Sequence, residues 1–417
     1  MTPLCGIRVL DFSTVFAGPH CGQLLGDYGA DVIKIEPKAG DDSRNWQPLH
    51  HGHAGSGTLF FVVNRNKRSV VVDLKSKDGI DIICRLVQSS DVVLQNFSAG
   101  VMDRLGLGYP QLKEINQRLI YCSISAFGEV GPMARARGYD PVIQAFSGMM
   151  QIPEEGGPPP TRLSIPLIDF TTGQNAFAGI LAAIIQRNTS GEGAHLEVCL
   201  ADSAVALQAW GLQRFWGTNV TNATNGATGT SVANGAKVNS TPAKAAGPVI
   251  SDNVPYESFK ASDGFVYIAC GNNKLWLLFC TAIARQDLAS NPAFQTNPAR
   301  RENYLALMEI LRPLIASQSR AHWERVFVQA GVPFAPINNL QELSVHPQIA
   351  ASNIIQEYDS AEFGKLNTVA RAVRFNGQIS PVGTPPPGLG EHTRAVLREA
   401  GFSDDDIDAY QRAGSIG

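Results

Sequence analysis

The residue best placed to do chemistry is Asp169, within the segment 165–173, Ile-Pro-Leu-Ile-Asp-Phe-Thr-Thr-Gly. Apolar residues at 177, 180, 181 and 184 follow it with helical spacing, which predicts a helix that begins close to Asp169. A carboxylate there faces the positive end of the helix dipole and is expected to stay ionised, as a nucleophile must. The alternative is structural, because Asp is also a preferred N-cap residue. This segment by itself does not separate the two roles.

A second concentration of reactive side chains is the cluster His-His-Gly-His at 50–53. It has no acidic or cysteine partner at the spacing of metal ligands, so we predict no metal site. The chain also contains neither G-x-G-x-x-G after its first predicted strand nor G-x-x-x-x-G-K-[ST]. Their absence disfavours a dinucleotide or ATP enzyme.

The elements that must position such residues are short β-branched runs that alternate with helix-like stretches such as 77–88. The runs lie at 7–12, 31–36, 69–74, 91–96 and 119–125. Their alternation predicts an α/β fold whose large domain holds a mainly parallel, Rossmann-like doubly wound sheet. Ligands of such sheets bind beyond the carboxyl ends of the strands. We therefore expect site residues in the segments 13–19, 37–46, 96–104 and 126–140.

The composition also predicts a second, smaller domain. From about 217 to 255 the chain is rich in Asn, Thr, Ser, Gly and Ala, which is typical of a long loop or linker. A predicted strand at 265–270 and helices at 275–285, 304–317 and 322–330 follow, enough for a small α+β domain. The predicted domains are 1–215 (large), 216–330 (linker and small domain) and 331–417 (linker and C-terminal return to the large domain, with a last helix near 392–400).

The length of the chain bears on the number of domains, and its charge bears on the kinds of molecule that it can bind. A chain of 417 residues with 44% hydrophobic content exceeds one compact domain. Its net charge of -3, without a basic stripe, argues against binding nucleic acid or anionic lipid. No apolar run reaches membrane-spanning length, and no leader motif is visible. The seven cysteines are dispersed without a C-x-x-C pair, so a cytoplasmic location is expected.

Short motifs along nearly the whole chain carry a resemblance. They are LDFSTVFAGP at 10–19, GADVIKIEP at 29–37, NKRS at 66–69, DLK at 73–75, NF at 96–97 with DRLG at 103–106, GYD at 138–140, Asp169 with Thr-Gly at 172–173, and LGEHT at 389–393. In this order they resemble the landmarks of the class III (CaiB/BaiF-type) CoA-transferases, typified by formyl-CoA transferase. No single motif is specific, but eight in register are.

The resemblance implies a chemical role for Asp169. Its carboxylate attacks a donor thioester to give a mixed anhydride, and the released CoA thiolate then attacks the aspartyl carbonyl to give an enzyme thioester. An incoming acid takes CoA by the reverse sequence. The implied partners are an acyl-CoA donor and a carboxylic acid acceptor, with the coenzyme A thioester as substrate and no permanently bound cofactor. Family members form interlocked homodimers, so a homodimer is expected.

The resemblance also implies the residues around the substrate. Those that line the CoA site, with cations meeting phosphates, are Val15, Lys75, Asn96, Phe97, Arg104 and Arg137. Tyr139 is expected beside the nucleophile, and Trp46 at the substrate pocket. Phe16 stands where formyl-CoA transferase has a glutamine, so either another donor replaces the glutamine or the pocket is more apolar here. The identity of both acids and the role of the 217–255 loop stay open.

Two alternatives remain at this point. An α-methylacyl-CoA racemase has the same fold and uses a histidine and an aspartate as acid and base. Family racemases carry histidine where this chain has Tyr139, and a tyrosine with an unperturbed pKa of about 10 is a poor proton shuttle. The other alternative is a CoA-binding protein without catalysis, against which the presence of Asp169, Tyr139 and Gly173 argues.

Overall fold

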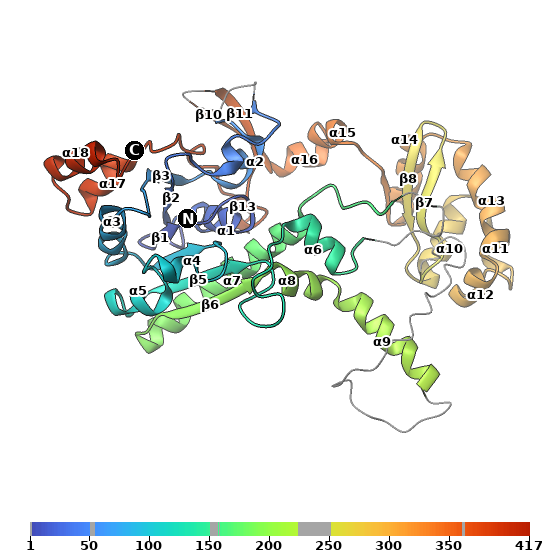
Figure 1. Ribbon diagram of the computed structural model, residues 1–417. Helices are drawn as coiled ribbons and strands as arrows, with labels where there is room; N and C mark the ends of the chain where they lie inside the picture. The colour runs from blue at the N-terminus through green and yellow to red at the C-terminus, as the bar shows by residue number, and fades with distance from the viewer. Residues whose placement is uncertain (1, 51–54, 151–156, 158, 224–251, 361–362) are drawn as a thin grey trace. The chain divides into compact units, whose positions relative to one another are not determined.

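The computed structural model describes the chain except residues 1, 51–54, 151–156, 158, 224–251 and 361–362 (Figure 1). The chain forms two compact units. Unit 1 comprises Met1–Thr230 and Ser352–Gly417, and unit 2 comprises Ser231–Ala351. The C-terminal segment therefore belongs to the same unit as the N-terminal half. The domain limits at 216 and 331 stay a prediction from composition.

A sheet of six parallel strands forms the centre of unit 1, in the order β3-β2-β1-β4-β5-β6. The strands are β1 (Arg8–Asp11), β2 (Asp31–Glu36), β3 (Lys67–Val71), β4 (Val92–Gln95), β5 (Ile120–Ser125) and β6 (Ala194–Cys199). Each of the five predicted runs falls on one of them. The sequence analysis missed β6. Its short Ala-His-Leu-Glu-Val-Cys sequence alternates small or apolar residues with polar ones, because an edge strand has one face open to solvent.

The order of the strands locates a crevice. The chain moves outward from β1 through β2 to β3, and then restarts on the other side of β1 with β4. The segments that leave the carboxyl ends of β1 and β4 consequently turn away from each other. In open parallel sheets this switch point is where ligands bind.

Helices cover both faces of the sheet, because successive strand residues point to opposite faces. Val9 and Val32 pack on one face against α1 (Ala17–Asp27), α7 (Leu167–Ser190) and α8 (Leu200–Leu207). Leu10 and Ile33 pack on the other against α3 (Lys77–Val87), α5 (Tyr109–Ile115), α17 (Thr393–Glu399) and α18 (Asp404–Ala413). Each such aliphatic side chain that becomes fully buried contributes roughly 1.5–3 kcal/mol. Two separate layers of core therefore hold the sheet.

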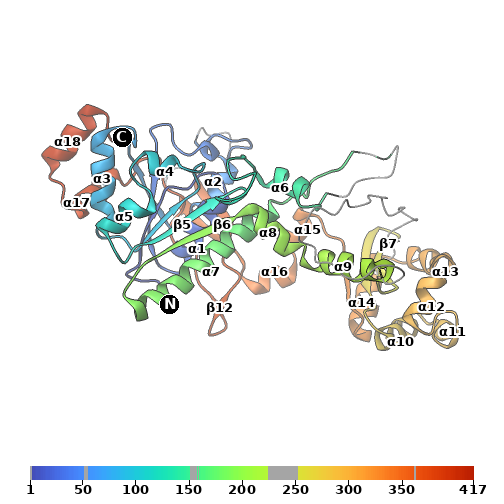
Figure 2. The same cartoon turned by 60° about the horizontal axis from the view of Figure 1, so that its bottom comes forward.

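The helix α7 runs along β5 and β6 in both views (Figures 1 and 2). Within the part of the chain that the structure describes, it is the one helix whose length and composition would allow it to cross a membrane. One face of α7, including Ile168, Ala176 and Ile180, is buried in the core against the sheet. This is the packing of a core helix, which passes the same test of length and composition.

The C-terminal helices lie beside α3 at one side of the sheet (Figures 1 and 2). The backbone N–H of Val71 donates to the Thr393 hydroxyl (3.1 Å), and that of His392 donates to the Ser69 carbonyl (2.9 Å). These contacts fasten the returning chain to β3. The other elements of unit 1 are η1 (Asp42–Arg44), α2 (Thr58–Val63), α4 (Val101–Arg104), α6 (Asp140–Phe146), α9 (Ala209–Ala223), β10 (Ile355–Ser360), β11 (Gly364–Val369), β12 (Arg374–Phe375) and β13 (Gln378–Ile379).

The predicted start of the linker at residue 217 is wrong. Helix α9 continues to Ala223, so the first seven residues of this stretch are helical. A polar composition rich in Asn and Thr gives low helix propensity, but an established helix propagates at little cost. Residues 224–251 of the predicted linker lie outside the described residues.

Unit 2 is a small antiparallel sheet, in the order β7-β8-β9, with helices packed on it. Its core is aromatic, with the rings of Trp276, Phe279, Phe327 and Trp323 stacked in series. The predicted strand at 265–270 and the three predicted helices all fall on elements of this unit. Its elements, with α16 running one residue into unit 1, are β7 (Tyr256–Ala261), β8 (Gly264–Ala269), β9 (Phe334–Pro336), α10 (Asn273–Ala282), α11 (Gln286–Ser290), α12 (Asn297–Glu302), α13 (Tyr304–Ala316), α14 (Arg320–Ala330), α15 (Leu340–Ser344) and α16 (Pro347–Ser352).

Candidate functional site

A cavity of about 260 Å³ opens at the switch point of the sheet in unit 1. The segments after β1, β4 and β5 and the first turn of α7 line it. The residues proposed from sequence that it brings together are Val15, Phe16, Asn96, Phe97, Arg137, Tyr139 and Asp169. These residues come from four segments spread over more than 150 positions. We call this space the Asp169 cavity.

Asp169 is the third residue of α7, and it does not cap the helix. The N-cap position is Pro166, whose side chain offers no acceptor. The carboxylate of Asp140 does the capping instead: its Oδ2 accepts from the backbone N–H of Ile168 (2.7 Å) and of Asp169 (3.1 Å). The structural alternative for Asp169 is therefore wrong. Because Asp140 satisfies the free N–H groups of this helix start, the carboxylate of Asp169 is left for the cavity.

The sequence analysis did not give Asp140 a role of its own. Asp140 is buried at the first position of α6, directly after Tyr139. Its Oδ1 accepts from the side-chain amide of Gln144, and the Gln144 carbonyl accepts from the backbone N–H of Leu163 (2.8 Å). The Gly-Tyr-Asp motif was the signal that could have found it, since a buried Asp in a turn implies donors to accept from.

Burial, together with the neighbouring negative charge of Asp140, raises the pKa of Asp169 to about 7. This corrects the expectation that the helix dipole alone keeps the carboxylate ionised. Loss of hydration penalises the charged form, and the like charge adds to the penalty. A carboxylate in a cleft whose pKa is raised toward 7 is typical of a functional residue, because its ionised form is poorly solvated and therefore reactive.

Polar contacts fix the conformation of the loop after β1, which lines the cavity together with Asp169. The side-chain amide of Asn96 accepts from the N–H of Thr14 and donates to the Thr14 carbonyl, both at 2.8 Å. Val15 has a positive φ of 70°, a strained conformation for a β-branched residue, and its N–H points to the Asp41 carboxylate (3.3 Å). Asp41 is itself paired with the buried Lys34 at 2.9 Å. The side chain of Asn96 thus holds the loop in place, and its contact with CoA stays a prediction.

Two cations and the ring of Tyr139 line the Asp169 cavity, whereas Trp46 does not line it and contacts it only through Tyr139, so its place at the substrate pocket stays a prediction. Arg135 and Arg137 both line the cavity and are exposed, so they are available to phosphate groups. Arg135 was missed by the sequence analysis. The ring of Tyr139 packs edge-on against Trp46, with 6.3 Å between ring centres, and both rings are largely exposed.

Two of the cations implied by the resemblance lie elsewhere. Lys75 and Arg104 are exposed and do not line the Asp169 cavity. Lys75 follows β3 and Arg104 ends α4. Their assignment to the CoA site stays a prediction.

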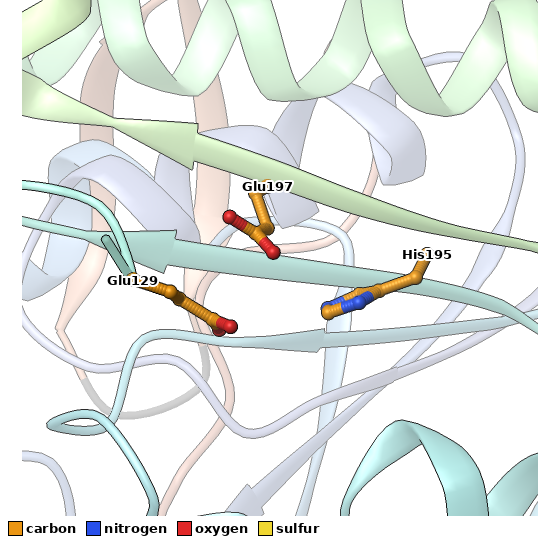
Figure 3. Close-up of side chains that lie close together, drawn as sticks. All are labelled: Glu129, His195 and Glu197. Carbon is orange, nitrogen blue, oxygen red and sulfur yellow. The ribbon is translucent and has the colours of Figure 1, made fainter.

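A separate group of side chains lies on the exposed face of β5 and β6. Glu129, His195 and Glu197 point toward one another, with one potential ligand atom of each within 4.8 Å of the others (Figure 3). His195 also contacts the Ser123 hydroxyl (3.0 Å) and stacks on Tyr109. Partial burial and the charge of Glu197 raise the pKa of Glu129. The sequence analysis predicted no metal site and missed this cluster, since β6 itself was missed. Of the predicted histidine cluster, residues 51–53 lie outside the described residues.

Comparison with known proteins decides the family. The family model described as CoA-transferase family III matches residues 4–393. The chain belongs to this family. The resemblance of its motifs is thereby confirmed, and so is the prediction that it is a CoA-transferase.

Relatives of this CoA-transferase span its whole length. It is 35% identical to the succinyl-CoA:glutarate CoA-transferase of Mus musculus over 402 residues, which cover 96% of this chain and 86% of the relative. It is 30% identical to the formyl-CoA:oxalate CoA-transferase of Escherichia coli O157:H7 over 429 residues, with both chains fully covered. A CaiB/BaiF family protein from Brucella suis has a similar structure, with a TM-score of 0.77, 32% identity, and coverage of 96% of this chain and 99% of that chain.

Proposed function

We propose that this CoA-transferase moves CoA reversibly from an acyl-CoA to a free carboxylic acid through covalent intermediates on Asp169. A carboxylate oxygen of Asp169 attacks the thioester carbonyl, the C–S bond breaks, and the thiolate of CoA leaves behind a mixed anhydride. The thiolate then attacks the aspartyl carbonyl and releases the donor acid. The acceptor carboxylate attacks the resulting aspartyl thioester, which expels the CoA thiolate and forms a second mixed anhydride. The thiolate finally attacks the acceptor's carbonyl in this anhydride, which gives the acceptor acyl-CoA and regenerates the Asp169 carboxylate.

The observation that carries this proposal is the meeting of Asp169 with residues implied for the CoA site in one cavity. Asp140 supports it further by taking over the capping of α7. The exposed cations Arg135 and Arg137 suit the phosphates of the CoA nucleotide. Tyr139, which lines the same cavity, suits the apolar pantetheine arm.

The racemase alternative receives less support. It requires a second acid–base group beside Asp169 to exchange a proton on the carbon next to the thioester. None of the described residues that line the Asp169 cavity is a histidine. Tyr139 occupies the position of the racemase histidine, and more than half of its surface is exposed.

Labelling of Asp169 tests the proposal. The wild-type chain is incubated with acetyl-, succinyl- and formyl-CoA, quenched with hydroxylamine and digested. Peptide mass spectrometry is expected to find a hydroxamate on Asp169. Asp169→Asn removes the label, whereas Asp202→Asn retains it on Asp169. Asp202 is the matched control, since it also lies in the first turn of a helix, α8, but outside the cavity. Full transfer activity in the Asp169→Asn chain would refute the mechanism.

Three further properties belong to the proposal. The strand order and the helices on both faces support a Rossmann-like, doubly wound large domain. The exposed aromatic residues Trp210, Phe215 and Trp216 of α9 support an interlocked homodimer, because apolar surface of this kind marks interaction sites. We also infer a cytoplasmic location, from the dispersed and unpaired cysteines.

A further inference from the structure

A second cavity of about 770 Å³ lies in unit 1 beside the Asp169 cavity. Helices α1, α2 and α7 and strand β11 surround it. The two cavities are separated by one layer of rings. Phe16 lines the first, and its ring packs edge-on against Phe170, which lines the second, with 4.7 Å between ring centres. Phe170 directly follows Asp169. We call this space the α1–α7 cavity.

The α1–α7 cavity is long as well as large. It begins at His20 on α1 and Phe170 on α7. It reaches Tyr28, which directly follows α1, and Phe177 on α7, and these two rings stack on each other with 5.3 Å between ring centres. Seven or eight residues of helix correspond to a length of about 10–12 Å. Its volume lies in the range of roughly 300–1,000 Å³ that is typical of small-molecule sites. The walls between the two ends are mostly apolar, with Leu24 among them.

The near end holds a polar group without a partner. His20 is more than nine-tenths buried, and neither of its ring nitrogens has a hydrogen-bond partner among the described residues. Burial, together with the charges of Lys67 and Arg65, lowers the pKa of His20 to about 4, so the imidazole is neutral at pH 7. A buried polar group left unpaired costs about 1–3 kcal/mol.

The far end holds a cation that is incompletely paired. Arg371 lies over the Tyr28 ring and donates to the Asp27 carbonyl and the Ser380 hydroxyl, but its buried Nε has no partner within the part of the chain that the structure describes. The Asp27 carboxylate is engaged by Arg65, with contacts of 2.6 and 2.8 Å. Asp27, Arg65 and Arg371 together therefore carry one net positive charge. Such an end favours an anionic group.

We propose that the α1–α7 cavity receives the body of the exchanged acid and that this acid is an α,ω-dicarboxylate of medium length. One carboxyl group reacts at Asp169, the methylene chain lies along α1 and α7, and the distal carboxylate meets Arg371. With C–C bonds of about 1.5 Å, a span of 10–12 Å corresponds to a chain of about 8–10 carbons. Rotation of the Phe16 ring joins the two cavities. The proposal rests on the proposed function, since it needs the acyl group to be attached at Asp169.

The test measures kcat/KM for matched acceptors with one donor that labels Asp169. Suberate and sebacate are compared with octanoate and decanoate, which have the same lengths but lack the distal carboxylate, and with succinate. In the wild type we expect the dicarboxylates to exceed the monocarboxylates by about 10–100-fold, the value of a charge-assisted hydrogen bond. Arg371→Gln is expected to bring this ratio close to one, and Arg371→Lys to keep most of it.

A second variant tests the space in the cavity and leaves the charge of Arg371 unchanged. Leu24→Trp fills the middle of the α1–α7 cavity and is expected to lower kcat/KM for the eight- and ten-carbon acids at least tenfold relative to succinate. Ile185→Trp is the matched control, because Ile185 is an exposed aliphatic residue of α7 outside both cavities. It is expected to leave the ratio of long to short acids unchanged.

The outcomes separate this proposal from the proposed function. Labelling of Asp169 with unchanged acid preference in Arg371→Gln and Leu24→Trp would overturn the dicarboxylate proposal and leave the transferase mechanism standing. A change of molar mass in Leu24→Trp without a change of acid preference would assign the cavity to a second copy of the chain and also overturn it. Absence of any label in the wild type would refute both.

Discussion

At the scale of single residues, Asp169 combines two demands that oppose each other. A nucleophile must be ionised, yet burial and the neighbouring Asp140 hold its pKa at about 7. The free energy that disfavours its charge is recovered when the carboxylate becomes a neutral anhydride. Poor solvation of the free carboxylate therefore contributes to its reactivity.

The first residue-scale prediction concerns pH. Only the ionised carboxylate attacks, so single-turnover labelling of Asp169 is expected to rise with pH and to reach half its maximum near pH 7. In Asp140→Asn the like charge is removed, so the midpoint shifts to lower pH. Quench-flow labelling at pH 5–9 measures both midpoints. An unchanged midpoint in Asp140→Asn would show that burial alone sets the pKa.

The second residue-scale prediction concerns stability. The pKa of Asp169 is raised in the folded chain, so stability is fully present below the unfolded pKa of about 3.8 and is lost as the pH rises through about 7. Asp169→Asn cannot ionise and escapes this loss. It is expected to raise the free energy of unfolding by roughly 2–4 kcal/mol at pH 8 and to change it little at pH 4. Urea unfolding at both pH values measures the difference, and an equal effect at both would contradict it.

At the scale of elements, the site depends on the register between loops that follow different strands. The loop after β1 is bound to the end of β4 through both hydrogen bonds of the Asn96 side chain. The start of α7 is bound to α6 through Asp140. Neither contact is local in sequence, so the position of each cavity segment depends on an element that is remote in the chain.

The element-scale prediction is that Asn96→Ala loosens the loop that carries Val15. Two hydrogen bonds to Thr14 are lost, and the free energy of unfolding is expected to fall by about 1–3 kcal/mol. KM for the acyl-CoA is expected to rise more than kcat falls, because the loop shapes the cavity and does not react. Asn116→Ala serves as a control, since the Asn116 amide also bonds backbone carbonyls, at 2.7 and 3.1 Å, but far from the cavity. An equal rise of KM in both variants would contradict the argument.

At the scale of the whole molecule, the candidate site lies within one of the two units. The functional residues placed here all belong to unit 1, which the chain leaves after α9 and rejoins near Ser352. The exposed aromatic rings on α9 are the surface that a partner would cover.

The whole-molecule prediction is a dimer that does not dissociate on dilution. Light scattering is expected to give twice the chain mass of 44.7 kDa, and mass photometry the same value at nanomolar concentration. An interlocked pair can separate only by unfolding, so the dimer signal should be lost together with the folded signal in urea. A monomer that appears on dilution while still folded would exclude interlocking.

The sequence predicted the elements of the sheet because strand periodicity and β-branched runs are local properties. The five runs at 7–12, 31–36, 69–74, 91–96 and 119–125 were found, whereas the half-exposed β6 was not. The sequence also identified the family, since the order of its short motifs can be read without any knowledge of distances.

Burial and distance between remote segments were decided only by the tertiary structure. The sequence could not assign the capping of α7 to Asp140, which lies 29 positions from Asp169 and reaches it only because α6 packs against α7. Nor could it place Lys75 and Arg104 outside the Asp169 cavity, or bring His20 and Arg371 to the two ends of one space. The type and order of residues can be read from the sequence. The solvation of a side chain and the contacts between remote segments are defined only once the chain has folded.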